Sequence, residues 1–136
     1  MQGSYSIEID SQRNLARMTL KGFFNPALLQ AFVNERNALY ARLSPGHVTL
    51  ADVREMQIQS QEMVEAFRRM LNDPNVQSRK LAFVTASSLA RMQLIRAAEA
   101  RVARLFESVD AAERWLMSDD AGEPLAPNLR SLVIDR

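Results

Sequence analysis

The sequence predicts a small α/β domain built on a mixed, mostly parallel sheet. Two segments that alternate apolar and polar residues come first, and helical and strand-like patterns then take turns along the chain. The short turn between the first two segments favours an antiparallel hairpin, whereas helices between the later strands favour parallel pairing. With 136 residues, 47% of them hydrophobic, the chain has the size and composition of one domain with a buried core.

The hairpin and a long helix are the clearest elements of the first part of the chain. Residues 5–10 and 15–21 alternate apolar and polar side chains. Asn25-Pro26 is a strong helix start, because Asn caps free amides and Pro fits the first helical position. Apolar residues then recur at helical spacing as far as Ser44-Pro45-Gly46, so we expect a helix over 26–43.

Strands and helices alternate strictly in the rest of the chain. Strands are predicted at 47–52, 81–84 and 102–106. The continuous apolar run at 81–84 is typical of a strand that is covered on both faces. A serine precedes each of three further predicted helices, where its side chain can cap the free amides. These serines are Ser60, Ser87 or Ser88, and Ser108.

The composition changes after residue 117. Residues 118–124 are polar and rich in turn formers, and a short apolar run follows at 129–134. We therefore expect one domain over 1–117 and a C-terminal extension over 118–136. The extension could be mobile or could dock on the body or on a partner. A strand from its apolar run could pair with the sheet edge of a second copy and form a homodimer.

Composition excludes several kinds of chemistry. The absence of cysteine excludes disulfides, thiolate metal sites and a cysteine nucleophile. A formal net charge of +1 offers no general attraction to nucleic acid. No apolar run approaches the roughly 20 residues that span a bilayer, and the N-terminus lacks the apolar stretch of a leader. We expect a cytoplasmic protein with no transmembrane segment and no nucleic-acid partner.

No constellation of catalytic residues is visible, so we do not expect an enzyme. His47 is the only histidine, and Asp52 and Glu55 do not stand at the spacing of a metal site or a catalytic triad with it. None of the four glycines lies in a phosphate-binding loop between a strand and a helix. We expect no metal and no cofactor, and a structural or surface role for His47.

Ser60 is the first candidate site. It stands where a predicted central strand gives way to a helix, and ligands of open α/β sheets collect at the carboxyl ends of the strands. The free amides of the helix start could hold a phosphoryl group added to Ser60, although a plain helix cap is the simpler interpretation. Together with Asp52, Ser60 forms our candidate phospho-switch or partner site.

Charge is distributed unevenly along the second half of the chain. A basic set and then an acidic set could form complementary surfaces for a protein partner or for self-association, or could simply be solvated helix faces. The basic set is Arg79, Lys80, Arg91, Arg96, Arg101 and Arg104, and the acidic set is Glu107, Asp110, Glu113, Asp119, Asp120 and Glu123.

An apolar pocket is the second candidate site. The seven methionines could fill the core or line an adaptable groove, and two phenylalanines precede the first helix. Such a pocket could hold a lipid-like molecule. Its expected lining is Phe23, Phe24, Ile58, Met63 and Phe67.

The order of elements resembles the SpoIIAA-like group, which is related in fold to STAS domains (anti-sigma-factor antagonists and domains attached to sulfate transporters). The resemblance covers about residues 5–117. It rests on the opening hairpin, on Val48-Thr49-Leu50-Ala51-Asp52 before a capped helix, and on the closing strand and helix at 101–116. It implies a SpoIIAA-like, STAS-type sheet of five mostly parallel strands with about four helices, the first strand being antiparallel at or near an edge.

The same resemblance implies a non-catalytic regulatory or protein-interaction module that binds a protein partner or itself. In STAS regulators a strand-end aspartate precedes a serine that a partner kinase phosphorylates. Asp52 matches that aspartate and Ser60 falls within about a residue of the phosphorylated position, but the flanking Asp and Gly are missing. The group is also similar to Sec14-type domains, which hold apolar ligands between sheet and helices. Binding of a small apolar ligand is therefore the alternative function.

Overall fold

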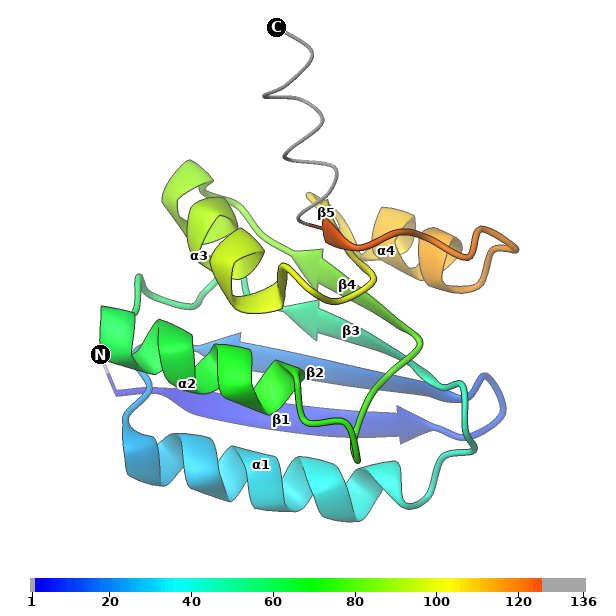
Figure 1. Ribbon diagram of the computed structural model, residues 1–136, viewed down its shortest axis with the longest axis horizontal. Coiled ribbons are helices and arrows are strands. Elements are labelled where there is room, and N and C mark those ends of the chain that lie inside the picture. Colours follow the sequence, from blue (N-terminus) through cyan, green and yellow to red (C-terminus); the bar gives the residue numbers. More distant parts are fainter. Residues whose placement is uncertain (1, 126–136) are drawn as a thin grey trace, which may run out of the picture.

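A five-stranded sheet forms the centre of the molecule, with strand order β1-β2-β3-β4-β5 (Figure 1). The computed structural model describes residues 2–125. The strands are β1 (Ser4–Asp10), β2 (Leu15–Lys21), β3 (Val48–Asp52), β4 (Lys80–Val84) and β5 (Ala103–Phe106), and the helices are α1 (Pro26–Tyr40), α2 (Gln61–Leu71), α3 (Ser88–Ala98) and α4 (Val109–Leu116). The predicted α/β class and its mixed, mostly parallel sheet are confirmed.

The first two strands form the predicted antiparallel hairpin, and every later pair is parallel. Ser4 lies opposite Lys21 and Asp10 opposite Leu15. Asn14 closes the turn with a φ of 54°, a left-handed conformation that Asn tolerates better than most residues. Its side chain also accepts from the amide of Ser44 and donates to the Ser44 carbonyl, so it ties the hairpin to the end of the α1 segment.

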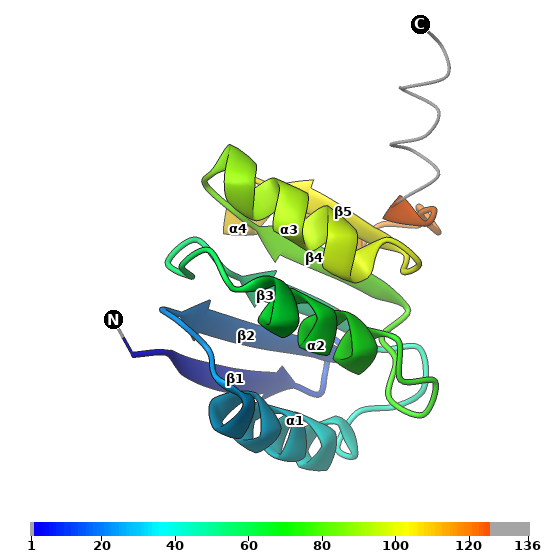
Figure 2. The ribbon, with the colours of Figure 1, turned by 60° about the vertical axis from the view of Figure 1, so that its left-hand side comes forward.

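The helices divide three to one between the faces of the sheet. Helices α1, α2 and α3 cover one face and α4 covers the other (Figure 2). Strand order never reverses along the chain. Since crossovers between parallel strands are almost always right-handed, three crossovers that advance in the same direction place their helices on the same face. Helix α4 follows the last strand, makes no crossover, and is free to fold onto the opposite face.

Alternating side chains of the strands supply two separate cores. In β3 and β4, Ala51 and Phe83 pack under α1 to α3, whereas Leu50 and Ala82 pack under α4. The larger core contains aromatic residues in edge-to-face contact, with ring centroids 5.4 Å apart for Phe24 and Phe67. Both faces of β3 and β4 are thus covered, as the continuous apolar run at 81–84 predicts.

The helix starts agree with the sequence signals, and one helix end does not. The side chains of Asn25, Ser60, Ser87 and Ser108 each accept a hydrogen bond from a first-turn amide. Helix α1 ends at Tyr40 rather than at residue 43. The amides of the following turn bond three residues back, to the carbonyls of Leu39 and Tyr40, and the α-helical pattern is lost there.

The first residues of the predicted C-terminal extension lie against the body. The Trp115 indole donates to Asp120, and the Leu125 amide donates to the Arg101 carbonyl. Pro124 forms an isolated antiparallel bridge with Val102, beside β5. The apolar run at 129–134 lies outside the described residues, so the strand and homodimer expected from it stay predictions.

Two members of the expected basic surface are buried. Lys80 is fully enclosed, and its Nζ donates to the Trp115 carbonyl at the end of α4. Arg101 is also buried and donates to the carbonyls of Leu71 and Ser78. The proposed basic surface is therefore wrong for these two residues, because each satisfies free backbone carbonyls inside the molecule.

Candidate functional site

The carboxyl edge of the parallel strands has no crevice imposed by topology. Such a crevice forms where the strand order reverses, and this sheet has no reversal. Instead, the loops that follow β2 and β3 run beside each other. The Gly22 amide donates to the Glu55 carbonyl over 3.0 Å, and the Gln57 amide donates to the Gly22 carbonyl over 3.1 Å. Two segments thus close this edge.

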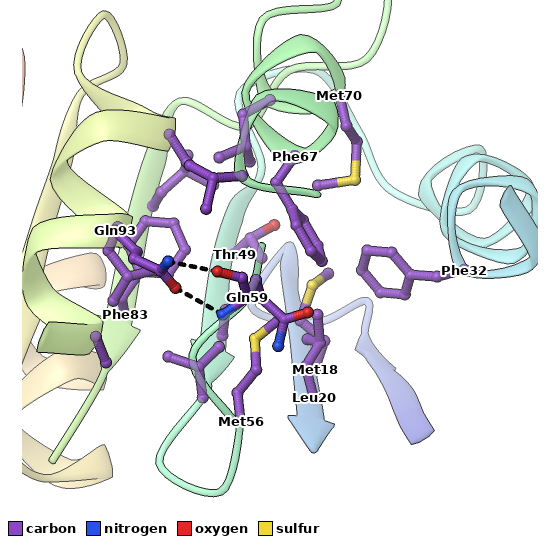
Figure 3. A pocket seen from close by; sticks show the side chains of 18 of the residues that line it. Met18, Leu20, Phe32, Thr49, Met56, Gln59, Phe67, Met70, Phe83 and Gln93 are labelled. Atoms are coloured by element: carbon purple, nitrogen blue, oxygen red, sulfur yellow. Dashed lines mark hydrogen bonds between the residues drawn. The ribbon is translucent and has the colours of Figure 1, made fainter. Parts of the chain in front are cut away.

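Gln59 holds the two loops together. Its buried side chain accepts from the Phe24 amide (2.9 Å) and donates to the carbonyls of Gly22 (3.0 Å) and Gln57 (2.6 Å). Its backbone also bonds in both directions with the Gln93 side chain of α3, at 2.9 Å and 2.8 Å (Figure 3). Neither glutamine was singled out from the sequence, because nothing in the spacing of a lone glutamine marks it as buried.

Large apolar side chains gather on the outside of this edge. Of the five that the described residues leave exposed, four stand on the closing loops or on the start of α3. We call them the apolar patch: Phe23 (49% exposed), Ile58 (41%), Leu89 (64%) and Met92 (61%). Phe23 and Ile58 are each next in sequence to a residue that forms a hydrogen bond with Gln59, and Met92 is next to Gln93. The hydrogen bonds of Gln59 and Gln93 therefore connect the segments on which the patch residues lie.

Ser60 lies exposed beside the patch, at the start of α2. Its Oγ accepts from the Met63 amide over 3.1 Å, which makes it the helix cap predicted from the sequence. Asp52 ends β3 and pairs with Arg54, at 2.7 Å and 3.0 Å. No hydrogen bond or ion pair joins Asp52 to Ser60 in the part of the chain that the structure describes.

The Asp52 carboxylate is not a proton donor or acceptor near neutral pH. The hydrogen bond from the Arg54 guanidinium lowers the pKa of Asp52 below its ordinary value, against a smaller opposing effect of burial. Arg54 is half exposed, and its pKa is raised by the same pair. Asp52 therefore stays ionised and occupied with its neighbour. The role of Ser60 and Asp52 as a phospho-switch or partner site stays a prediction.

An apolar cavity of about 90 Å³ lies beneath this edge, between the sheet and helices α1 to α3. Phe32 from α1, Phe67 and Met70 from α2, and Met18 from β2 point toward a common centre (Figure 3). Gln59 and Gln93 stand on its side toward the apolar patch. The described chain thus contains a hollow where a small apolar molecule would meet mainly carbon and sulfur atoms.

Of the five residues expected around an apolar pocket, the structure places Phe67 on the wall of this cavity. Phe24 is buried beside Phe67, while Met63 lines a surface groove between α1 and α2. Phe23 and Ile58 belong to the exposed patch instead. The expected set is therefore divided between the cavity, the core and the surface, and its role in ligand binding stays a prediction.

The end of the cavity near the amino ends of the strands is polar. Arg36 and Tyr40 from α1 and Thr49 from β3 line it. The Tyr40 and Thr49 hydroxyls are 2.6 Å apart, and Thr49 is also 2.6 Å from the Ser78 hydroxyl. The sequence carried one signal for this end that was missed: Arg36 follows Phe32 and precedes Tyr40 at four-residue intervals, in the buried stripe of its helix.

The described residues show neither a metal centre nor a membrane span. Within residues 2–125, no three His, Asp or Glu side chains gather closely enough to hold a metal ion. In that same range, no helix has both the length and the apolar character needed to cross a membrane.

Comparisons with known proteins identify the fold. No protein-family model and no curated protein matches the sequence. The structure is similar to that of an anti-sigma factor antagonist from Mycobacterium paratuberculosis, with a TM-score of 0.59 and 9% identity over 85% of this chain and 96% of the other. It is also similar to an uncharacterised protein of the DUF3478 family with a SpoIIAA-like fold, from Shewanella loihica PV-4, with a TM-score of 0.64 and 17% identity over the same shares. The chain has a SpoIIAA-like fold, as the resemblance implied.

Proposed function

We propose that the protein is a non-catalytic interaction module that binds a protein partner, or a second copy of itself, through the apolar patch and the adjoining Ser60. The observation that carries the proposal is the position of the patch: four of the five large apolar side chains that residues 2–125 leave exposed share one edge. Large apolar side chains left exposed together at one edge of a small domain are typical of interaction sites. The shared fold with an anti-sigma factor antagonist supports a regulatory role. We place this role in the cytoplasm, as expected from the sequence.

Ser60 gives this surface a means of control. A negative charge at the first turn of α2 is favourable for the helix itself, and Asp caps helices about as well as Ser. The same charge beside Phe23 and Ile58 would have to lose its hydration in an apolar interface, which is costly. Phosphorylation of Ser60 would therefore weaken docking while the fold persists.

Affinity capture from extracts of the source cells, with mass spectrometry, tests the proposal. We expect one protein to be captured by wild type and by Ser60→Ala, and to be lost with Ser60→Asp and with Phe23→Ser combined with Ile58→Ser. Met117→Ser is the matched control, because Met117 is exposed to a similar degree but lies outside the patch. Equal capture by all the variants, or loss with Met117→Ser, would contradict the proposal.

We infer a second function from the cavity, the binding of a small apolar ligand. Its support is the apolar lining supplied by Met18, Phe32, Phe67 and Phe83, in a hollow that ordinary core packing would fill. Native mass spectrometry of gently purified protein should reveal a co-purified small molecule. Ala97→Leu, which adds bulk to the cavity wall, should abolish that extra mass, whereas finding only the bare protein mass would count against this function.

A further inference from the structure

Arg36 is a buried cation without a buried anion. The side chain is 3% exposed, and no carboxylate of the described residues lies within ion-pair distance of it. Its Nε and Nη2 donate to the Asn37 side chain at 3.1 Å and 2.9 Å, and the guanidinium carbon stands 5.4 Å from the Tyr40 ring centre. Nη1 has no acceptor among residues 2–125. Burying a guanidinium in this way is costly, since a charge is ordinarily buried only with a partner.

The second buried arginine at this end makes the imbalance larger. Arg101 uses its guanidinium on the carbonyls of Leu71 and Ser78, so it has a structural role. Burial lowers the pKa of both arginines, and each guanidinium still stays charged at neutral pH. Asp73 is the acidic group that acts on Arg36 from α2's end, but it lies beyond ion-pair distance. Among the described residues, the Arg36 guanidinium thus has no paired anion and can accept one from a ligand.

Arg36 stands at the junction of two hollows. Together with Met70 it lines both the apolar cavity and a surface groove of about 350 Å³ between α1 and α2. A molecule bound at this junction could place a charged group against the guanidinium and an apolar chain in the cavity. The groove would give its path from solvent, past the apolar Val33 and Ala66. Charged side chains also line the same groove, namely those of Glu62, Arg69 and Asp73.

The hydroxyls near Arg36 offer a further donor. Tyr40, Thr49 and Ser78 hold three hydroxyl protons, and their two short contacts of 2.6 Å use two of them. The remaining contact, in which Ser78 donates to Tyr40, is long at 3.5 Å and weak. An acceptor at the polar end of the cavity would have to compete only with this weak contact for the third hydroxyl proton.

We propose that Arg36 binds the carboxylate of a short-chain aliphatic acid whose tail enters the apolar cavity. This site rests on the second proposed function, the apolar-ligand module, and specifies its ligand class. A guanidinium and a carboxylate form charge-assisted, often paired, hydrogen bonds, and water-excluded surroundings strengthen them. The cavity is small, about 90 Å³, so its occupant is a short chain.

The test compares hexanoate with hexan-1-ol and hexylammonium, which have the same tail and a different head. Protein with ¹³C-labelled methionine methyl groups reports binding, because Met18 and Met70 line the cavity and Met117 does not. We expect hexanoate to shift the Met18 and Met70 signals, to leave Met117 in place, and to bind more tightly than hexan-1-ol. Hexylammonium should not bind, because the guanidinium repels it.

Arg36→Met should lower the affinity for hexanoate about tenfold or more and leave that for hexan-1-ol unchanged. It should fold, because an apolar side chain often replaces a buried charge without loss of stability. Arg42→Gln is the matched control, since Arg42 is an exposed arginine just beyond the same helix. If Arg36→Met does not fold, the proposal is tested with Arg36→Lys in its place, and by comparing the affinities of wild type for hexanoate and hexan-1-ol.

Two outcomes would contradict the carboxylate site, and only the second also contradicts the apolar-ligand function. If hexanoate binds no more tightly than hexan-1-ol, or binds equally to wild type and Arg36→Met, Arg36 is not a carboxylate site, but the cavity can still bind apolar ligands. If neither compound shifts the Met18 or Met70 signals, the carboxylate site and the apolar-ligand function are both wrong.

Discussion

At the scale of single residues, buried polar groups set this protein apart from a plain layered core. His47, Lys80, Arg36 and Arg101 are all buried, and they do different work. Lys80 and Arg101 donate to backbone carbonyls, which stabilises the ends of neighbouring elements. The Nε2 atom of His47 is buried, and no described residue forms a hydrogen bond with it. An unsatisfied buried nitrogen costs stability, and the cost grows if the ring becomes charged.

His47 should make the protein acid-sensitive above the range in which carboxylates titrate. Burial is the main cause that lowers the pKa of His47; Arg101 and Arg36 act in the same direction, and a hydrogen bond to the Ser44 backbone opposes them. Because the unfolded chain titrates near 6.5, it binds a proton more readily than the folded protein. The contribution of neutral His47 to the free energy of unfolding is therefore complete above about pH 6.5, the pKa in the unfolded chain, and it is lost as the pH falls through the lower pKa of the folded protein.

Urea denaturation at neutral pH and at about pH 5 measures this effect. The free energy of unfolding of wild type should fall between these conditions, and that of His47→Phe should fall less, because Phe keeps the ring contact with Tyr40, whose centroid is 4.4 Å away. The NMR signal of the single imidazole gives the midpoint directly. A midpoint above the ordinary value, or equal losses in the two proteins, would contradict the assignment.

At the scale of elements, the parts that local chemistry dictates could be predicted. Asn25-Pro26 and the capping serines mark helix starts, because a cap acts on amides within its own first turn. The hairpin follows from alternation and a short turn. Gln59 could not be found this way, since its partners Phe24 and Gly22 are distant in sequence. The position of Phe67 at the pocket could be predicted because helical spacing turns its side chain inward. Ile58 lies in a loop, where no periodic pattern indicates which side chains are buried.

Gln59 and Gln93 should act as one unit in closing the carboxyl edge. Gln59→Leu removes the partners of the Phe24 amide and of two carbonyls, so we expect a loss of about 1–3 kcal/mol in the free energy of unfolding. Gln93→Leu leaves the Gln59 backbone unpaired and should cost a similar amount. Because both changes free the same loop, the double variant should lose less than the sum of the two.

Denaturation of the single and double variants gives the coupling between these glutamines, and hydrogen exchange shows where the opening occurs. Faster exchange should be confined to the loops at 22–25 and 53–59 and to the start of α3. Gln30→Leu serves as the control, because the Gln30 side chain is exposed and, within the described part of the chain, bonds to Asn34 of its own helix alone. Additive losses, or faster exchange spread over the whole sheet, would show that the two glutamines act independently.

At the scale of the whole molecule, the separation of the two cores leaves few links between α4 and the edge hairpin. Helix α4 packs over β3 to β5, whereas β1 and β2 belong mainly to the core under α1 to α3. A group of charges spans this gap on the α4 side. Glu113 accepts from Arg17 at 3.1 Å and 3.2 Å and from Arg13 at 2.9 Å. These residues join opposite ends of the chain, so the group closes the fold.

The Glu113 group should give stability that depends on both pH and salt. Hydrogen bonding from Arg17 is the main cause that lowers the pKa of Glu113, with Arg13 adding to it. A carboxyl with a lowered folded pKa contributes stability above its unfolded value, near 4.3, and loses it as the pH falls through the folded value. Glu113→Gln should therefore cost up to about 1 kcal/mol at neutral pH, since the group is partly exposed, and less at high salt.

The comparison that isolates this link is Glu113→Gln against Glu65→Gln, measured by urea denaturation at neutral and strongly acid pH. Glu65 pairs with Arg68 within α2, so its loss affects one helix and joins no distant parts. We expect Glu113→Gln to be the more destabilising at neutral pH and to match wild type once the carboxyl is protonated. Hydrogen exchange should also rise in β1 and α4 together. If Glu65→Gln lowers the free energy of unfolding as much as Glu113→Gln does, or if Glu113→Gln still differs from wild type at acid pH, then packing alone holds α4 against the hairpin and the Glu113 charges contribute nothing specific.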